Sequence, residues 1–65
     1  KNYPAMTIKL NRAIELIGFI RPDKSIKLEA GETHTVLLID SNKDYCKLNF
    51  SGINKILFYD EFVFV

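Results

Sequence analysis

A single histidine and a single cysteine are the residues of this 65-residue chain best suited to acid–base or nucleophilic chemistry. A histidine base needs partners that orient it, and Glu32 shares a strand face with His34 and could pair with it. A cysteine nucleophile needs an exposed thiolate and a nearby base, whereas Cys46 alternates with two apolar residues in the manner of a buried hydrophobe. We interpret His34 as an ordinary residue at a sheet surface and Cys46 as a core residue.

Four acidic residues lie in or beside expected turns: Asp40, Asp44, Asp60 and Glu61. Acids in turns usually accept hydrogen bonds from nearby backbone amides, whereas a metal ion needs several converging oxygens, which this spacing does not impose. One cysteine and one histidine are too few for a tetrahedral zinc site. We therefore predict no catalytic residue, no metal and no cofactor, and we expect that the protein is not an enzyme.

The composition is that of one small domain, and its single cysteine cannot form a disulfide bond within the chain. The chain is 48% hydrophobic, and its nine basic and eight acidic residues are interleaved, for a net charge of +1. A lone thiol suits a reducing cytoplasm, and neither a membrane-spanning apolar run nor a signal peptide is visible. We expect a cytoplasmic protein over residues 6–65, with residues 1–5 a non-native remnant or a disordered N-terminus, since Met6 could be the first native residue.

Residues 7–20 contain the one ambiguous segment of the chain. Residues 7–10 alternate like a strand, and the isoleucine-rich segment 12–20 favours a second strand. The alternative is an α+β fold with a short helix over residues 11–18, because apolar residues also recur at helical spacing there and Asn11 could cap the helix.

The rest of the chain reads as short strands separated by turns that contain glycine or several polar residues. The expected strands cover residues 25–29, 33–40, 45–50, 53–59 and 62–65, with a tight hairpin turn at Ser51-Gly52. Residues 33–40 read as a central strand covered on both faces, whereas 45–50 alternate cleanly and predict one buried face. This pattern indicates an all-β fold, a small barrel or sandwich, and at this length we expect a closed or nearly closed barrel, since closure removes exposed edges.

Several of these residues resemble the small SH3-like proteins of phages and their bacterial hosts. The run from Ile17 to Leu38 is similar to the front half of that family, and residues 58–62, F-Y-D-E-F, resemble its late strand, one-turn break and anchoring aromatic. The resemblance covers about residues 15–65 and implies a five-stranded SH3-like barrel with a binding role. Since the aromatic signature of signalling SH3 domains is absent, and His34 stands where a tyrosine is usual, the resemblance does not imply binding of proline-rich peptides.

The last third of the chain carries the strongest functional signal. Nine of the thirteen residues from 53 to 65 are apolar or aromatic, more than a thin domain is expected to bury. We predict a protein-binding surface anchored by four aromatic residues: Phe58, Tyr59, Phe62 and Phe64. The partner is expected to be another protein, for instance a host enzyme blocked by a phage-encoded inhibitor, or a second copy in a homodimer.

A nucleic-acid-binding barrel is the alternative function. Small barrels can stack bases on aromatic rings and hold phosphates with lysines. The candidate residues are Lys43, Tyr45, Lys47 and Lys55. The weak basic excess makes this alternative the less favoured one.

Overall fold

The computed structural model describes residues 2–18 and 25–65 and contains only strands and turns within them. The strands are β1 (Ala5–Leu10), β2 (Ile14–Ile17), β3 (Ser25–Leu28), β4 (Thr33–Ser41), β5 (Tyr45–Phe50), β6 (Ile53–Phe58) and β7 (Phe62–Phe64). The all-β prediction is confirmed. Within these two ranges there is also no helix of the length and apolarity that crossing a bilayer requires.

The favoured strand is confirmed at Ile14–Ile17, so the alternative α+β fold with a helix over residues 11–18 is wrong. Every residue of β2 pairs with β3 in an antiparallel ladder, from Ile14 opposite Leu28 to Ile17 opposite Ser25. Ile14 and Leu16 are buried while Glu15 and Ile17 are exposed, which is the period of two of a strand. Residues 19–24, which include the end of the expected strand 12–20 and most of the turn after it, lie outside the described residues.

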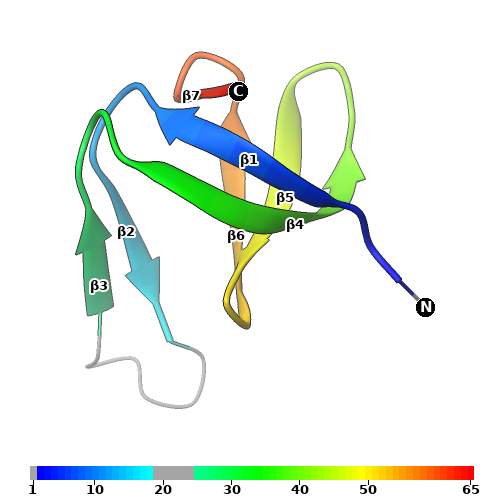
Figure 1. Ribbon diagram of the computed structural model, residues 1–65, viewed down its shortest axis with the longest axis horizontal. Coiled ribbons are helices and arrows are strands. Elements are labelled where there is room, and N and C mark those ends of the chain that lie inside the picture. The colour runs from blue at the N-terminus through cyan, green and yellow to red at the C-terminus, as the bar shows by residue number, and fades with distance from the viewer. Residues whose placement is uncertain (1, 19–24) are drawn as a thin grey trace.

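The strands form two antiparallel sheets (Figure 1). The larger sheet has the order β6-β5-β4-β1-β7, and β2 and β3 form a separate hairpin. β1 and β4 run across the direction of β5 and β6, and the hairpin lies beside them (Figure 1). Each of the seven segments expected to be extended overlaps one of these strands, but the expected five-stranded barrel is not confirmed, because the strands form two sheets and no closed barrel is found among the described residues.

Eleven side chains form one core between the concave face of the large sheet and the hairpin: Ile8, Leu10, Ile14, Leu16, Leu28, Val36, Cys46, Leu48, Phe50, Leu57 and Phe62. In β5 the three core residues alternate with half-buried Tyr45, Lys47 and Asn49, so the predicted alternation of that strand is confirmed. Cys46 is buried, as expected. We call the concave side of the sheet the inner face and the opposite side the outer face.

β4 is the central strand of the large sheet, as predicted, but only its inner face is covered. Leu37 lies on the outer face opposite Asn49 and is exposed, whereas its neighbour Val36 is in the core. The expectation of two covered faces fails because the hairpin packs on one side of the sheet only. A register shift between Leu38 and Asp40, a β-bulge, interrupts the β4–β5 ladder, and bulges of this kind bend the strand that carries them.

Both glycines in the described turns have the positive φ values that glycine adopts without strain. Gly31 has φ 90°, and the two-residue turn between β5 and β6 places Ser51 at φ 51° and Gly52 at φ 98°. Two successive positive φ values define the hairpin turn that matches the twist of the flanking strands. The Asn49 side chain accepts a hydrogen bond from Gly52 N at 2.9 Å, and this bond stabilises the turn.

Candidate protein-docking surface

An apolar cluster occupies the outer face near the end of β6, where Tyr45, Ile56 and Phe58 lie on neighbouring strands. We call these three residues the outer patch. Tyr45 is directly opposite Phe58, and their rings meet edge to face with centroids 5.9 Å apart. Phe58 is 53% exposed and Ile56 is 46% exposed. Phe58 was predicted as a docking residue, whereas sequence reasoning missed Ile56; its spacing of two residues from Phe58 was the signal that could have identified it.

A second group, the aromatic row, consists of Tyr59, Phe62 and Phe64. The Phe62 ring lies 6.0 Å from Tyr59 and 5.1 Å from Phe64 between centroids. Phe62 is only 2% exposed and belongs to the core, whereas Phe64 is 44% exposed. The prediction that Phe62 anchors a partner is therefore wrong, because β7 places that ring under the sheet. Of the four predicted docking residues, Phe58, Tyr59 and Phe64 are at the surface.

Tyr59 has a structural role as well as an exposed ring. Its hydroxyl donates to the Asn42 carbonyl at 2.7 Å and lies 3.5 Å from the Cys46 thiol, which donates to it. The Asn42 side chain in turn accepts from the amides of Asp44 and Tyr45. The bond from Cys46, followed by desolvation, raises the pKa of Tyr59 above its ordinary value. Tyr59 therefore holds the turn between β4 and β5 against the turn that follows β6.

The turn between β6 and β7 is fixed at both ends. The Glu61 carboxylate accepts from Phe58 N at 2.9 Å, and Glu61 N donates to the Phe58 carbonyl at 2.9 Å. Asn11, just after β1, donates its backbone amide to Glu61 O at 2.8 Å and its side-chain amide to Asp60 O at 3.1 Å. The exposed Arg12 lies 3.3 Å from the Asp60 carboxylate. These bonds fix the direction in which the chain leaves Phe58 and enters β7.

Of the four acids predicted to satisfy turn amides, two do so and a third pairs with a basic side chain. Glu61 does so at Phe58, and Asp40 accepts from the amide of Ser41 at 2.9 Å. Asp60 instead faces Arg12. In the part of the chain that the structure describes, no three histidine, cysteine or acidic side chains gather as a metal site would require.

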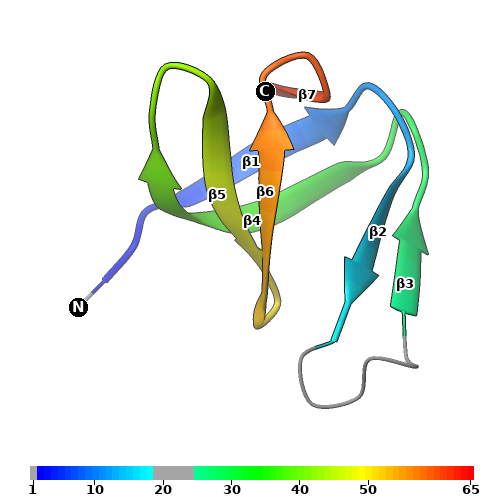
Figure 2. The same ribbon diagram turned by 180° about the vertical axis from the view of Figure 1, so that it is seen from behind.

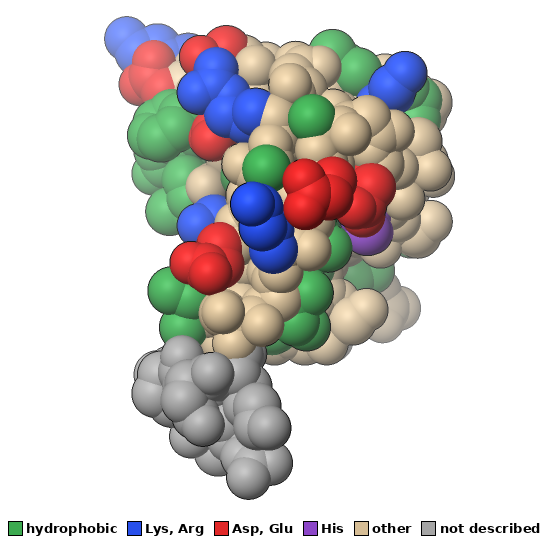
Figure 3. Space-filling model, turned by 90° about the vertical axis from the view of Figure 1, so that its left-hand side faces the viewer, with side chains coloured by type: hydrophobic (Ala, Val, Ile, Leu, Met, Phe, Trp, Pro, Cys, Tyr) green, Lys and Arg blue, Asp and Glu red, His purple; other side chains and the backbone are tan. Residues whose placement is uncertain are grey.

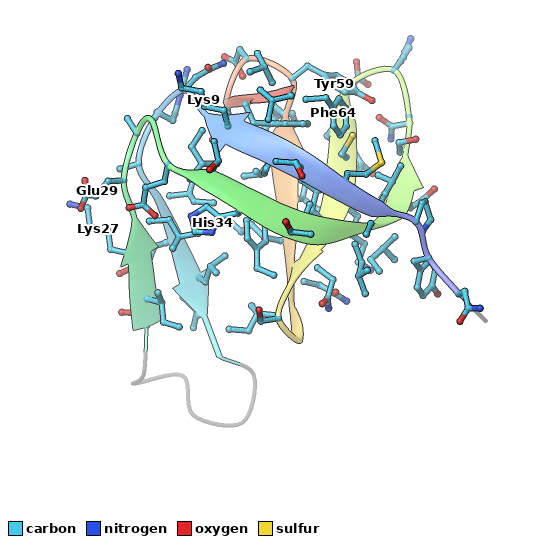
Figure 4. All side chains as sticks on the ribbon, in the orientation of Figure 1. Lys9, Lys27, Glu29, His34, Tyr59 and Phe64 are labelled. Carbon is cyan, nitrogen blue, oxygen red and sulfur yellow. The ribbon has the colours of Figure 1, made fainter. Side chains whose placement is uncertain are left out.

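His34 lies toward the β2–β3 hairpin, away from Tyr59 and Phe64 (Figure 4). Its Nε2 is 2.8 Å from the Glu32 carboxylate, so the predicted pairing is confirmed, and its ring meets Phe50 edge on at 6.2 Å. The backbone amide of Glu29, and then His34, lower the pKa of Glu32. His34 also lines an open groove of about 210 Å³ together with Leu16, Ile26, Leu28, Thr35, Phe50 and Ser51. Acidic and basic side chains alternate over the outside of this region (Figure 3).

The four candidate nucleic-acid residues do not share one surface. Tyr45 and Lys47 lie on the outer face of β5, and Lys43 is in the exposed turn before it. Lys55 faces the inner side, because it is opposite Leu48, a core residue. The Tyr45 ring meets Phe58 edge to face and belongs to the outer patch. Lys55 is therefore separated from the other three candidate residues.

Comparison of the chain with protein-family models, with curated proteins and with solved structures finds no match. The assignment of a role to this protein therefore depends on the geometry of its surface. The outer patch and the aromatic row meet at one end of β6, because Phe58 and Tyr59 are consecutive residues that belong to the two groups.

Proposed function

We propose that this protein is a non-catalytic module that docks on another protein through the apolar surface at the end of β6 and along β7. One observation carries the proposal. Of the ten large hydrophobic side chains that are exposed in the described residues, six lie between residues 56 and 65: Ile56, Phe58, Tyr59, Val63, Phe64 and Val65. Concentrated apolar exposure on a small domain is typical of an interface, and aromatic rings are the usual anchors there.

We further propose that the fold is an SH3-like small barrel and that the module is a phage accessory protein that inhibits a host enzyme. The end of the chain supports the SH3-like reading, since a strand ends at Phe58, a one-turn break follows, and the aromatic Phe62 anchors the next strand in the core. The inhibitor role follows from the resemblance to phage proteins. A module of this size would act by covering a surface of its target.

The docking surface is tested by placing a charge at its centre. Phe58→Asp and Phe64→Asp change exposed side chains, so each variant is expected to fold while losing its partner. Ile17→Asp is the matched control, because Ile17 is 56% exposed but lies on the separate β2–β3 hairpin. Bacterial host lysate is passed over each immobilised protein, and the captured protein is then purified and titrated by calorimetry.

Loss of one aromatic ring at an interface hot spot typically costs about 2 kcal/mol or more, so we expect affinity to fall by at least about 30-fold for the two phenylalanine variants. The Ile17 variant is expected to bind like the parent chain. Equal binding by all four proteins would refute the proposed surface. Binding to oligonucleotides that weakens steeply with added salt would instead support the nucleic-acid alternative.

A further inference from the structure

Lysines lie beside two of the three exposed aliphatic side chains of the docking surface. Ile56 on β6 is directly opposite Lys47 on β5. Val63 on β7 is directly opposite Lys9 on β1. Directly opposite residues of an antiparallel pair share one face of the sheet, with Cβ atoms about 4.5–5.5 Å apart. Since β7 lies close to the end of β6 (Figure 2), both lysines border the docking surface.

Lys47 has no acidic partner among the residues that the structure describes. Neither of the two ion pairs found in residues 2–18 and 25–65 involves it. Asp40 is opposite Lys47 on β4, which is the side away from Ile56. The Asp40 carboxylate accepts a hydrogen bond from Ser41 N at 2.9 Å instead. Lys47 therefore contributes an unpaired positive charge beside the outer patch.

Lys9 is unpaired in the same way. It is exposed, and the residue opposite it on β4 is the uncharged Thr33. The acid on the β7 side is Glu61, whose carboxylate accepts from Phe58 N at 2.9 Å. Neither ion pair of the described ranges includes Lys9, so its charge also has no counterpart there.

The other charges around the docking surface offset one another. Lys43 and Asp44 are consecutive exposed residues in the turn between β4 and β5. Arg12 and Asp60 face each other at 3.3 Å beside the turn between β6 and β7. The charge that is left without a counterpart beside the apolar residues is therefore positive.

We propose that the partner of this surface is a protein segment that carries carboxylates beside its apolar side chains, and that Lys9 and Lys47 pair with those carboxylates. The inference rests on the proposed function and deepens it, because it names the chemistry of the partner. Charge complementarity of this kind favours the right partner and speeds the encounter with it.

Contact with a partner removes water from the two ammonium groups while it covers Ile56 and Val63. A desolvated charge without a counterion opposes binding, and a like charge on the partner opposes it further. A carboxylate at either position compensates for the lost hydration and accepts a charge-assisted hydrogen bond from the lysine. The apolar residues therefore supply the contact area, whereas the lysines select an acidic partner over a neutral or basic one.

The test compares two short synthetic peptides, each titrated into the isotope-labelled protein and followed through the amide chemical shifts of β5, β6 and β7. Both peptides present leucine, phenylalanine and leucine at alternate positions, with aspartate between them in one and lysine in the other. The aspartate peptide is expected to bind at least about fivefold more tightly. Lys47→Ala and Lys9→Ala are each expected to lower this preference about twofold or more. Lys27 is exposed on the separate hairpin, so Lys27→Ala is the matched control and is expected to leave the preference unchanged.

Phe58→Ala tests the docking function in the same experiment, because it should weaken both peptides and leave their ratio unchanged. Binding that Phe58→Ala does not weaken would count against the docking surface. Equal binding of the two peptides, a preference that persists in both lysine variants, or no binding by either peptide would overturn the charge preference. A short single-stranded oligonucleotide that binds more tightly than the aspartate peptide, and that loses affinity in Lys47→Ala, would overturn it in favour of the nucleic-acid alternative.

Discussion

Phe62 and Phe64 are two residues apart on β7, and their contrasting burial gives a sharp test of where the core ends. We compare Phe62→Ala with Phe64→Ala. Phe62 is 2% exposed between Tyr59 and Phe64, so its truncation leaves a cavity and is expected to cost about 3–5 kcal/mol. Phe64 is 44% exposed, so roughly half of a full burial energy of about 1.5–3 kcal/mol is at stake, together with about 0.5–1.5 kcal/mol from its edge-to-face contact.

These costs are large for a chain of this size. At about 0.05–0.15 kcal/mol per residue, 65 residues correspond to an unfolding free energy of about 3–10 kcal/mol. Phe62→Ala therefore removes much or all of the stability, whereas Phe64→Ala costs about 1–3 kcal/mol and leaves a folded protein. Urea unfolding monitored by far-ultraviolet circular dichroism measures both, with a slope near 1 kcal/mol/M expected for so small a domain. Equal midpoints for the two variants, or a loss below about 1 kcal/mol for Phe62→Ala, would refute the assignment of Phe62 to the core.

Two further predictions concern the pH dependence of stability and the hairpin turn. The pKa of Glu32 is lowered in the folded state, so its contribution to stability is present above the unfolded value of 4.5 and is lost as the pH falls through the folded value. Glu32→Gln should therefore reduce the change in urea midpoint between pH 6 and pH 2, and Glu15→Gln, the control, should reduce it less. Ser51 adopts φ 51° next to Gly52, so Ser51→Asn, which tolerates this conformation better, is expected to raise stability by about 0.3–1 kcal/mol. An unchanged or lower thermal midpoint for Ser51→Asn would contradict that account of the turn.

Local patterns in the sequence predicted where the strands lie, but not how deeply each side chain is buried. The period of two in residues 45–50 assigned the correct face to each side chain of β5, because one face of that strand packs on the core along its whole length. The same rule placed Phe62 and Phe64 on one face and could not distinguish them. Phe62 lies opposite Leu10 and Phe64 lies opposite Ile8, and both of these partners are buried, so pairing with β1 does not distinguish the two rings either. Alternation determines the face of a residue, whereas the depth of its side chain depends on which other elements cover it.

The candidate surface was also predicted only in part: the exposed rings were indicated by the sequence, but their contacts were not. The abundance of apolar residues near the end of the chain correctly indicated exposed rings at Phe58, Tyr59 and Phe64. Residue types alone could not show that the Tyr59 hydroxyl is bonded to Asn42 or that Lys55 faces the opposite side from Lys47. Both facts depend on which strands are neighbours, and the pairing of β1 with β4 and β7 joins segments that lie far apart in the chain.

The position of β1 between β4 and β7 has a consequence for synthesis on the ribosome. β1 emerges well before one of its neighbours in the sheet, β7, which comprises residues 62–64. Until those residues leave the exit tunnel, Phe62 cannot cover Leu10, and the nascent chain presents apolar groups that chaperones bind. Since these contacts span some fifty positions, folding is expected to be completed after translation of this region rather than during it, and to be slow for so short a chain.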